Sequence, residues 1–146
     1  MIVTVDQTNI FEAAAVHSMS WRESHRSFCA PGFTELRTPE RQVDCLTRKM
    51  LAGSRIYMLV EEKPVGVVSV TGSLIEDLYV LPDRQNMGYG TRLLRYAIGK
   101  CKGVPTLWIL ENNTRAERLY RKMGFRRTGR INPSPGGLKE IELALE

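Results

Sequence analysis

The stretch from Leu78 to Gly90 constrains the fold of this chain more than any other part of its sequence. A run of strand-forming residues, Leu-Tyr-Val-Leu-Pro, is followed by a short polar loop and by glycines at positions 88 and 90. We expect a strand that stops at Pro82 and a helix that starts near the glycines, because glycine lets a backbone approach a ligand without a Cβ in the way. The first amides of a helix have no partner inside it and lie at the positive end of its dipole. The stretch therefore predicts either a phosphate or diphosphate site or, as the simpler alternative, a tight turn.

The hydrophobic periodicity on either side of this stretch predicts one mixed sheet with helices on its faces. Strand-like runs occur at residues 2–5, 56–60, 65–70, 74–81, 106–110, 125–131 and 138–145. Helical spacing and caps predict helices that start after Asn9 and at Thr38-Pro39, and two more at about 87–101 and 113–123, with residues 20–37 irregular. The helix between the runs at 74–81 and 106–110 makes these two strands parallel neighbours, whereas short turns indicate antiparallel pairing before them. We therefore expect a single α+β domain over residues 1–146.

A second stretch, from Asn112 to Phe125, has a polar and small face that a purely structural helix does not need. At helical spacing, one face carries Asn113, Ala116, Tyr120 and Gly124. A face that served only the core would hold large apolar residues throughout. Leu119 and Met123 supply such a stripe beside it. The helix is therefore a candidate for ligand contact as well as for packing.

Taken together, the two stretches resemble the GNAT superfamily of N-acetyltransferases. The resemblance is carried by Gln85-x-x-Gly88-x-Gly90 behind a strand that ends Leu-Tyr-Val-x-Pro, and by Asn113-x-x-Ala116-x-x-x-Tyr120-x-x-x-Gly124-Phe125. It covers residues 56–125 well, and the N-terminal third only in the order of its elements. It implies a mixed, mostly antiparallel central sheet of about six to seven strands flanked by about four helices, with parallel strands 4 and 5 splayed apart. It also implies an acetyl-CoA-dependent enzyme that acetylates a primary amine.

In the family that this chain resembles, the pantetheine arm lies along the open edge of the first splayed strand, as an added strand would. Its amides would bond to the backbone near Leu78 and Val80, and the diphosphate would sit on the amides that open the next helix. The positions that the resemblance assigns to acetyl-CoA are Leu78, Tyr79, Val80, Arg84, Gln85, Asn86, Met87, Gly88, Tyr89, Gly90, Thr91, Asn113, Ala116 and Tyr120. This chain departs from the family at Asn86 and Met87, since many relatives have a basic residue just before the first glycine. Arg84 is the nearest substitute.

Two side chains are candidates for the proton transfers that the resemblance implies. Tyr120 would give a proton to the departing thiolate, although a buried phenol at this place can also simply complete the core. Glu76 would take a proton from the acceptor amine, and its alternative role is that of an ion-paired surface carboxylate. By the period of two, Glu76 shares one side of its strand with Leu78 and Val80. The Leu78 amide is a candidate for binding the oxyanion, and Glu111 is a weaker candidate base.

The sequence leaves the acceptor open. It is a small amine, an amino acid, an antibiotic, or a protein lysine or N-terminus, and transfer of a longer acyl group is a further alternative. In the family that this chain resembles, acceptor specificity comes from the first two helices and their connection. Here that region holds residues that either line an acceptor pocket or cap the core: Trp21, Arg22, His25, Phe28 and Phe33.

The formal net charge of +5 favours an anionic partner. Cations crowd one short region at Arg115, Arg118, Arg121, Lys122, Arg126, Arg127 and Arg130. They form either a solvated helix face, or a surface that steers an anionic cofactor, or the binding face of a nucleic-acid-binding module. The last is the rival function, and it has less support because the chain shows no recognised nucleic-acid motif.

The remaining features argue against other classes of protein. The apolar runs are too short to span a bilayer and the N-terminus lacks the basic flank of a signal peptide, so we expect a cytoplasmic protein without a membrane partner. Neither His17 nor His25 lies near a cysteine at zinc-site spacing, so no metal is expected. A homodimer through the C-terminal strands would fit the family that the chain resembles.

Overall fold

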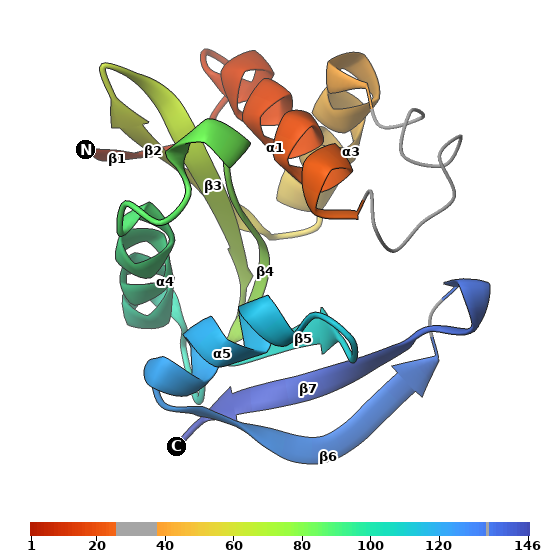
Figure 1. Ribbon diagram of the computed structural model, residues 1–146. Coiled ribbons are helices and arrows are strands. Elements are labelled where there is room, and N and C mark those ends of the chain that lie inside the picture. The colour runs from red at the N-terminus through yellow and green to blue at the C-terminus, as the bar shows by residue number, and fades with distance from the viewer. Residues whose placement is uncertain (26–37, 134) are drawn as a thin grey trace.

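A seven-stranded sheet forms the centre of the molecule in the computed structural model, which describes residues 1–25, 38–133 and 135–146 (Figure 1). The strands lie in the order β1-β2-β3-β4-β5-β7-β6. Their bounds are β1 Ile2–Thr4, β2 Arg55–Glu61, β3 Lys63–Thr71, β4 Leu74–Val80, β5 Thr106–Leu110, β6 Phe125–Pro133 and β7 Lys139–Leu145. Neighbouring strands are antiparallel except for β4 and β5, so the predicted mixed, mostly antiparallel sheet is confirmed.

The helices of the described residues cover both faces of this sheet. They are α1 Ile10–His25, α3 Pro39–Leu51, α4 Tyr89–Lys100 and α5 Thr114–Lys122, with short 3₁₀ helices η1 Pro82–Arg84 and η2 Pro135–Gly137. Helices α1 and α3 pack together on one face, and α4 and α5 lie on the other (Figure 1). No helix among the described residues is long and apolar enough to cross a membrane.

Alternation along β2 separates the two faces into two apolar clusters. Ile56 and Met58 belong to the cluster beneath α1 and α3. Tyr57 and Leu59 belong to the cluster beneath α4 and α5. Successive side chains of a strand point to opposite faces, so one strand serves both cores.

Strands β4 and β5 diverge from each other. They pair at one position in the described structure, Leu74 with Thr106. Beyond it β4 stays paired with β3 as far as Val80, while β5 pairs with β7 as far as Leu110. The predicted splaying of strands 4 and 5 is therefore confirmed, and the β5-facing edge of β4 has no strand partner among the described residues from Ile75 to Val80.

Strand β4 contains a β-bulge near its middle. The register between β3 and β4 shifts between Val67 and Ser69, so β4 has one more residue than β3 at this point. Asp77 lies in the bulge with a φ of 55°, in the left-handed region that residues other than glycine rarely adopt. A residue in such a conformation needs contacts that hold it there, and these are described below.

The prediction that Glu76 shares a face of the sheet with Leu78 and Val80 was wrong, because of this bulge. Glu76 and Asp77 both contact Lys49 on α3, whereas Leu78 and Val80 pack against the cluster beneath α4 and α5. One extra residue in the strand shifts the alternation by one position, which moves Glu76 to the opposite face. The carboxylates of β4 thus face α1 and α3.

Helix α1 is longer than predicted. Residues 20–25, which the sequence indicated as irregular, continue the helix to His25. Ser20 and Trp21 are buried in this last part, and burial stabilises a helix more than the propensities of its residues do. Phe28 and Phe33, named with Trp21 as acceptor-site candidates, lie outside the described residues.

The two predicted N-caps differ in outcome. Thr38 caps α3 as predicted, because its hydroxyl accepts from the Arg41 amide at 3.3 Å and Pro39 opens the helix. Asn9 does not cap α1 with its side chain. Its Oδ1 instead accepts from the Asp6 amide at 2.8 Å, which stabilises the turn before the helix.

Candidate active site

The start of α4 presents free backbone amides beside the end of β4. Gly88 is the N-cap residue with a φ of 86°, and no side chain caps the helix. The Arg92 amide donates to the Gly88 carbonyl at 3.1 Å. Helix geometry leaves the amides of Tyr89, Gly90 and Thr91 without an acceptor inside the helix. Because they also lie at the positive end of the helix dipole, they can bind an anion.

The loop between β4 and α4 is exposed and fastened at its base. Gln85 Nε2 donates to the Val80 carbonyl at 3.2 Å, which ties the loop to the end of the strand. Asn86 has a φ of 63°, and both Asn86 and Met87 are exposed. Arg84, the predicted substitute cation, lies half-buried in η1. The loop therefore offers amides to an anion but carries few positive side chains.

The start of α5 lies next to the start of α4. A Cβ at Gly90 would lie at ordinary van der Waals distance from two side chains, 3.8 Å from Val80 Cγ2 and 3.9 Å from Leu119 Cδ2, so β4, α4 and α5 meet at this point. Arg115 Nη2 donates to Asn86 Oδ1 at 3.2 Å and connects the two helix starts directly. The structure thus brings together the two stretches that the sequence singled out.

Helix α5 carries a capping asparagine at its start and a buried, neutral phenol in its last turns. Asn113 caps the helix, because its Oδ1 accepts from the Ala116 amide at 3.2 Å. Tyr120 is 9% exposed and meets the Phe125 ring edge to face at 5.9 Å. Burial raises the pKa of Tyr120 to about 12, so the hydroxyl stays protonated at neutral pH. A buried, protonated phenol can act as a proton donor.

A partly buried ionic cluster lies on the opposite face of β4, around Asp77. His17 Nε2 on α1 lies 3.3 Å from Asp77 Oδ1, and Lys49 Nζ on α3 contacts Asp77 Oδ2. Ser69 Oγ donates to the Glu76 carbonyl at 3.2 Å and also contacts Asp77. Burial raises the pKa of Asp77, but the imidazole of His17 and the ammonium group of Lys49 beside it outweigh burial and hold that pKa well below its ordinary value. The Asp77 carboxylate is therefore ionised and held on two sides.

Sequence reasoning singled out Glu76 and missed Asp77. Glu76 is the more exposed of the two carboxylates, with 42% of its side chain accessible against 24% for Asp77, and it lies 3.5 Å from Lys49 Nζ. Strict alternation along β4 would place residues 76 and 77 on opposite faces of the sheet. The bulge turns both carboxylates to the same face, and so the sequence pattern alone does not indicate the cluster. Across the described ranges, no three His, Cys, Asp or Glu side chains are grouped to hold a metal ion.

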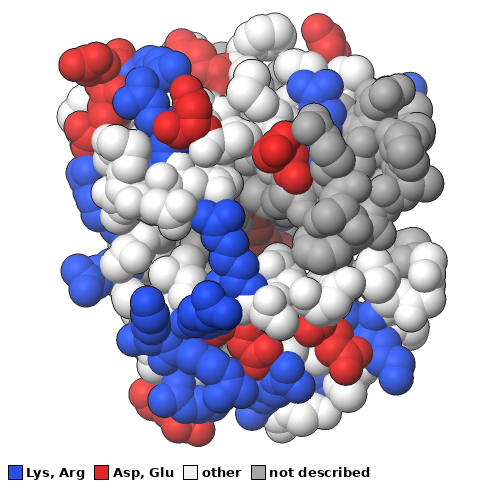
Figure 2. Space-filling model, viewed as in Figure 1, with Lys and Arg blue, Asp and Glu red and all other residues white. Residues whose placement is uncertain are grey.

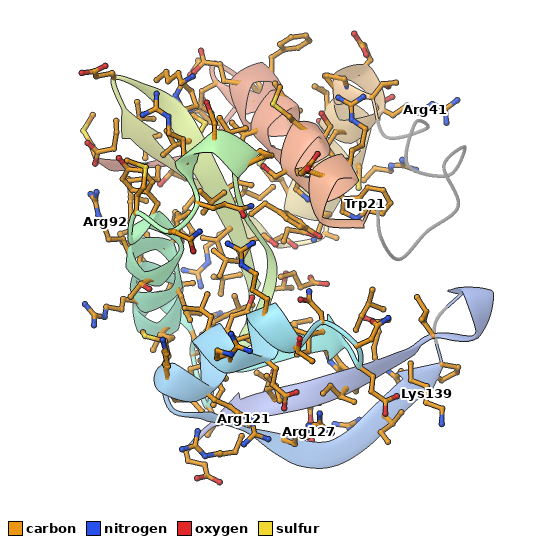
Figure 3. All side chains as sticks on the ribbon, viewed as in Figure 1. Trp21, Arg41, Arg92, Arg121, Arg127 and Lys139 are labelled. Atoms are coloured by element: carbon orange, nitrogen blue, oxygen red, sulfur yellow. The ribbon has the colours of Figure 1, made fainter. Side chains whose placement is uncertain are left out.

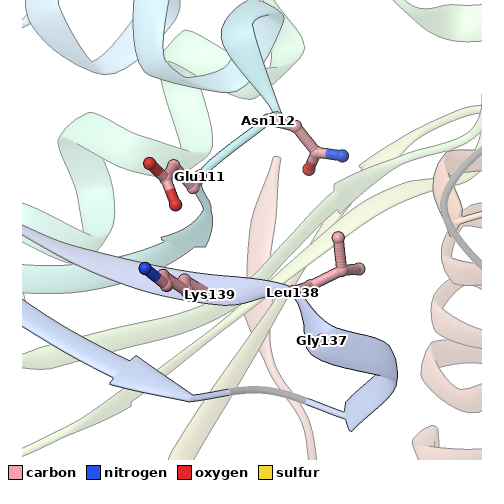
Figure 4. Close-up of a pocket in the computed structure, with 5 residues that line it drawn as sticks. All are labelled: Glu111, Asn112, Gly137, Leu138 and Lys139. Carbon is pink, nitrogen blue, oxygen red and sulfur yellow. The ribbon is translucent and has the colours of Figure 1, made fainter.

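A pocket of about 340 Å³ lies at the end of β5 (Figure 4). Its lining residues are Glu111, Asn112, Gly137, Leu138 and Lys139. They come from the connection between β5 and α5 and from the end of η2 and the start of β7. A hydrogen bond from the Glu111 amide to the Lys139 carbonyl at 2.8 Å joins the two segments. Among its described lining residues, Glu111 supplies a carboxylate and Lys139 an ammonium group.

Basic side chains gather over α5 and β6 (Figure 2), where Arg121 and Arg127 lie close together (Figure 3). Both bind Glu117, which is only 7% exposed: Arg127 donates to it at 2.7 and 2.8 Å and Arg121 at 3.2 Å. The bonds from Arg127, and then those from Arg121, outweigh burial and lower the pKa of Glu117 to about 2. Arg130 lies 3.7 Å from Glu142. Several of the cations between Arg115 and Arg130 are thus paired with carboxylates of the protein itself. These pairs favour a structural role for those cations over binding to a nucleic acid.

The splayed strands and the two helix starts lie in a segment that matches a known protein family. A model of the acetyltransferase (GNAT) domain matches residues 52–127, which is more than half of the chain and includes the splayed strands and both helix starts. The chain belongs to the GNAT acetyltransferase family. The resemblance drawn from the two sequence motifs is thereby confirmed.

Individual GNAT relatives extend this result over the whole fold. The peptidyl-lysine N-acetyltransferase YjaB of Salmonella typhimurium is 37% identical over 70 residues, 48% of each chain, so the match spans about half the length of that relative. The solution structure of apo-form YjaB from Escherichia coli has a TM-score of 0.74 at 26% identity and covers 99% of this chain and 95% of its own. The structure of yncA from Salmonella typhimurium with its cofactor acetyl-CoA has a TM-score of 0.73 at 20% identity, covering 100% and 92%. This GNAT fold therefore includes α1 and α3 as well as the segment that matches the family model.

Proposed function

We propose that this protein transfers the acetyl group of acetyl-CoA to a primary amine, by direct attack of the amine on the thioester. The observation that carries the proposal is that the open edge of β4 ends beside the free amides of α4, with the buried phenol of Tyr120 in the same apolar cluster as Leu78 and Val80. A thioester cofactor with a diphosphate at one end and amides along its arm needs these three features. The related yncA structure, which holds acetyl-CoA, supports the choice of cofactor.

In this proposal, the cofactor binds along β4. The pantetheine amides bond to the backbone of Leu78 and Val80, whose β5-facing edge has no strand partner among the described residues. The diphosphate sits on the loop and the first turn of α4, from Gln85 to Thr91. Asn113 has used its carbonyl oxygen to cap α5, so its amide group is left to donate to the arm.

The reaction needs an unprotonated amine, a site for the oxyanion and a proton for the sulfur. The amine nitrogen attacks the carbonyl carbon, the C–S bond breaks and the amide bond forms, while a base takes the proton that the amine releases. The Leu78 amide, next to the bulge, is our candidate donor to the oxyanion. Tyr120 gives the proton to the thiolate, and Glu76 is our candidate base.

For the acceptor we propose a lysine side chain, of a protein or of a small molecule. The name of the related YjaB, a peptidyl-lysine N-acetyltransferase, supports this choice. The pocket between Glu111 and Lys139 is our candidate for part of the acceptor site, because a carboxylate there can hold the ammonium group of an incoming amine.

Two measurements test the proposed function. A thermal-shift titration with acetyl-CoA should raise the melting temperature, because a ligand that binds only the folded state stabilises it. Thiol release from acetyl-CoA should then be followed across small amines, amino acids and lysine-containing peptides, and repeated with longer acyl-CoA donors. Absence of a thermal shift together with salt-sensitive RNA or DNA binding would favour the nucleic-acid-binding alternative instead.

A further inference from the structure

The loop that would hold the diphosphate lacks positively charged side chains. From Gln85 to Thr91 it contains no Lys or Arg, and the nearest cation in the chain before it, Arg84, is half-buried in η1. Backbone amides can bind phosphate oxygens, but they carry only partial charges. A diphosphate is fully ionised at neutral pH and is held more strongly when a cation also pairs with it. Arg92, the first cation after the loop, pairs with Glu61 at 2.6 Å, so the missing charge is best supplied by another element.

Arg115 is placed to supply it. This residue lies in the first turn of α5, and its Nη2 reaches across to the loop and donates to Asn86 Oδ1 at 3.2 Å. Its side chain is exposed, and among the described residues it has no carboxylate partner. Arg121 and Arg127 differ from it, because both are committed to Glu117.

The contact with Asn86 prepares the guanidinium for a ligand. Asn86 lies with a φ of 63° in a conformation that asparagine tolerates better than most residues, and its amide oxygen occupies one donor of a group that has five. The other donors remain for phosphate oxygens, which a guanidinium binds in a bidentate manner. A side chain that is already held near the site loses less conformational freedom when the ligand arrives.

We propose that Arg115 binds the diphosphate of the coenzyme and is the cation that the loop between β4 and α4 lacks. The inference rests on the proposed function, since it concerns the same cofactor. Arg115 acts in binding and takes no part in the proton transfers. It joins the two helix starts in one phosphate site, with amides from α4 on one side and a guanidinium from α5 on the other.

The test is a calorimetric titration of the intact protein with two probes. Coenzyme A carries both the diphosphate and a 3′-phosphate, whereas dephospho-coenzyme A keeps only the diphosphate. Arg115→Gln should raise the Kd for both probes by the same factor, about five- to tenfold, and should flatten its dependence on salt. The matched control is Arg118→Gln, which removes an equal, exposed charge from the same helix and should leave both values within about twofold.

A coupling measurement separates the proposal from general electrostatics. Asn86→Gly, which removes the side-chain amide but keeps the left-handed backbone accessible, should weaken binding in the parent protein and have little further effect once Arg115 is Gln, because the two side chains act together. An unchanged Kd for Arg115→Gln would overturn the proposal, as would an equal loss for Arg118→Gln or a loss confined to the probe with the 3′-phosphate. The parent protein must saturate with coenzyme A in the same experiment, and its failure to do so would overturn the proposed function itself.

Discussion

The imidazole of His17 on α1 lies 3.3 Å from the carboxylate of Asp77, and the contact joins a buried helix residue to the bulge of β4. His17 is 2% exposed, and its ring also meets Tyr79 edge to face at 4.9 Å. With Lys49 on the other side, Asp77 is held in a left-handed conformation that costs about 1–3 kcal/mol on its own. The cluster therefore fixes the point at which β4 changes face, one residue before the proposed oxyanion donor at Leu78.

Removing the Asp77 carboxylate should destabilise the fold. We expect Asp77→Ala to lower the free energy of unfolding by about 2 kcal/mol, because it leaves His17 and Lys49 without their common partner. Asp77→Asn should lose about half as much, since asparagine accepts hydrogen bonds and tolerates the left-handed backbone. Urea unfolding of the three proteins measures the difference. Equal stability of the parent and Asp77→Ala would show that the cluster does not hold the bulge.

The same carboxylate should make stability depend on pH. The folded-state pKa of Asp77 is lowered, so its contribution is fully present above the unfolded-state pKa near 3.8 and is lost as the pH falls through the lower folded-state pKa. Between about pH 5 and pH 2 the parent should therefore lose more stability than Asp77→Asn. Unfolding curves at several pH values test this, and the other carboxylates cancel in the comparison. Parallel pH profiles would contradict an ion-paired Asp77.

Tyr120→Phe should lower the rate of acetyl transfer without weakening the binding of acetyl-CoA. We expect turnover to fall about 10- to 100-fold, because the thiolate loses its proton donor, while the Kd for acetyl-CoA stays within about twofold. Initial rates of thiol release and calorimetry give the two values. Tyr57→Phe is the matched control, since Tyr57 is a buried phenol of the same apolar cluster and should keep full turnover. Unchanged turnover in Tyr120→Phe would assign the phenol to the core alone.

Glu76→Gln should change the pH dependence of the rate. If Glu76 takes the proton from the acceptor amine, the limb of the pH–rate profile that reports the base should disappear and turnover at neutral pH should fall about 100-fold or more. The comparison variant is Glu111→Gln, which removes the weaker candidate in the pocket at the end of β5. A profile of Glu76→Gln with the same limbs as the parent would clear Glu76 of this role and leave it as an ion-pair partner of Lys49.

The parts of the fold that the sequence predicted depend on short-range signals. The parallel order of β4 and β5, the glycine start of α4 and the helix that begins near Asn113 are indicated by patterns along the sequence, so they could be recognised before the structure was known. The splaying of the two strands was expected from the resemblance to the GNAT superfamily. The bulge at Asp77 could not, because its left-handed backbone is held by His17 and Lys49, which lie far away in the sequence. Strict alternation therefore predicted that Glu76 and Leu78 lie on the same face of the sheet, whereas the bulge places them on opposite faces.

Burial explains two further differences. The last turns of α1 were predicted to be irregular, yet Ser20 and Trp21 are buried and the helix continues through them. Asn9 matches a cap by pattern, but its side chain bonds to the turn before the helix. The contact of Arg115 with Asn86 likewise depends on how α4 and α5 pack, and no local pattern in either segment indicates it.

The two apolar clusters are kept apart by the sheet, and this separation has an evolutionary consequence. The cluster beneath α4 and α5 is built almost entirely from the segment that matches the family model, whereas α1 and α3 come from the part of the chain before it. Substitutions in α1 and α3 can therefore accumulate without repacking the other side. The side of the sheet on which we propose that the coenzyme binds can then stay almost unaltered.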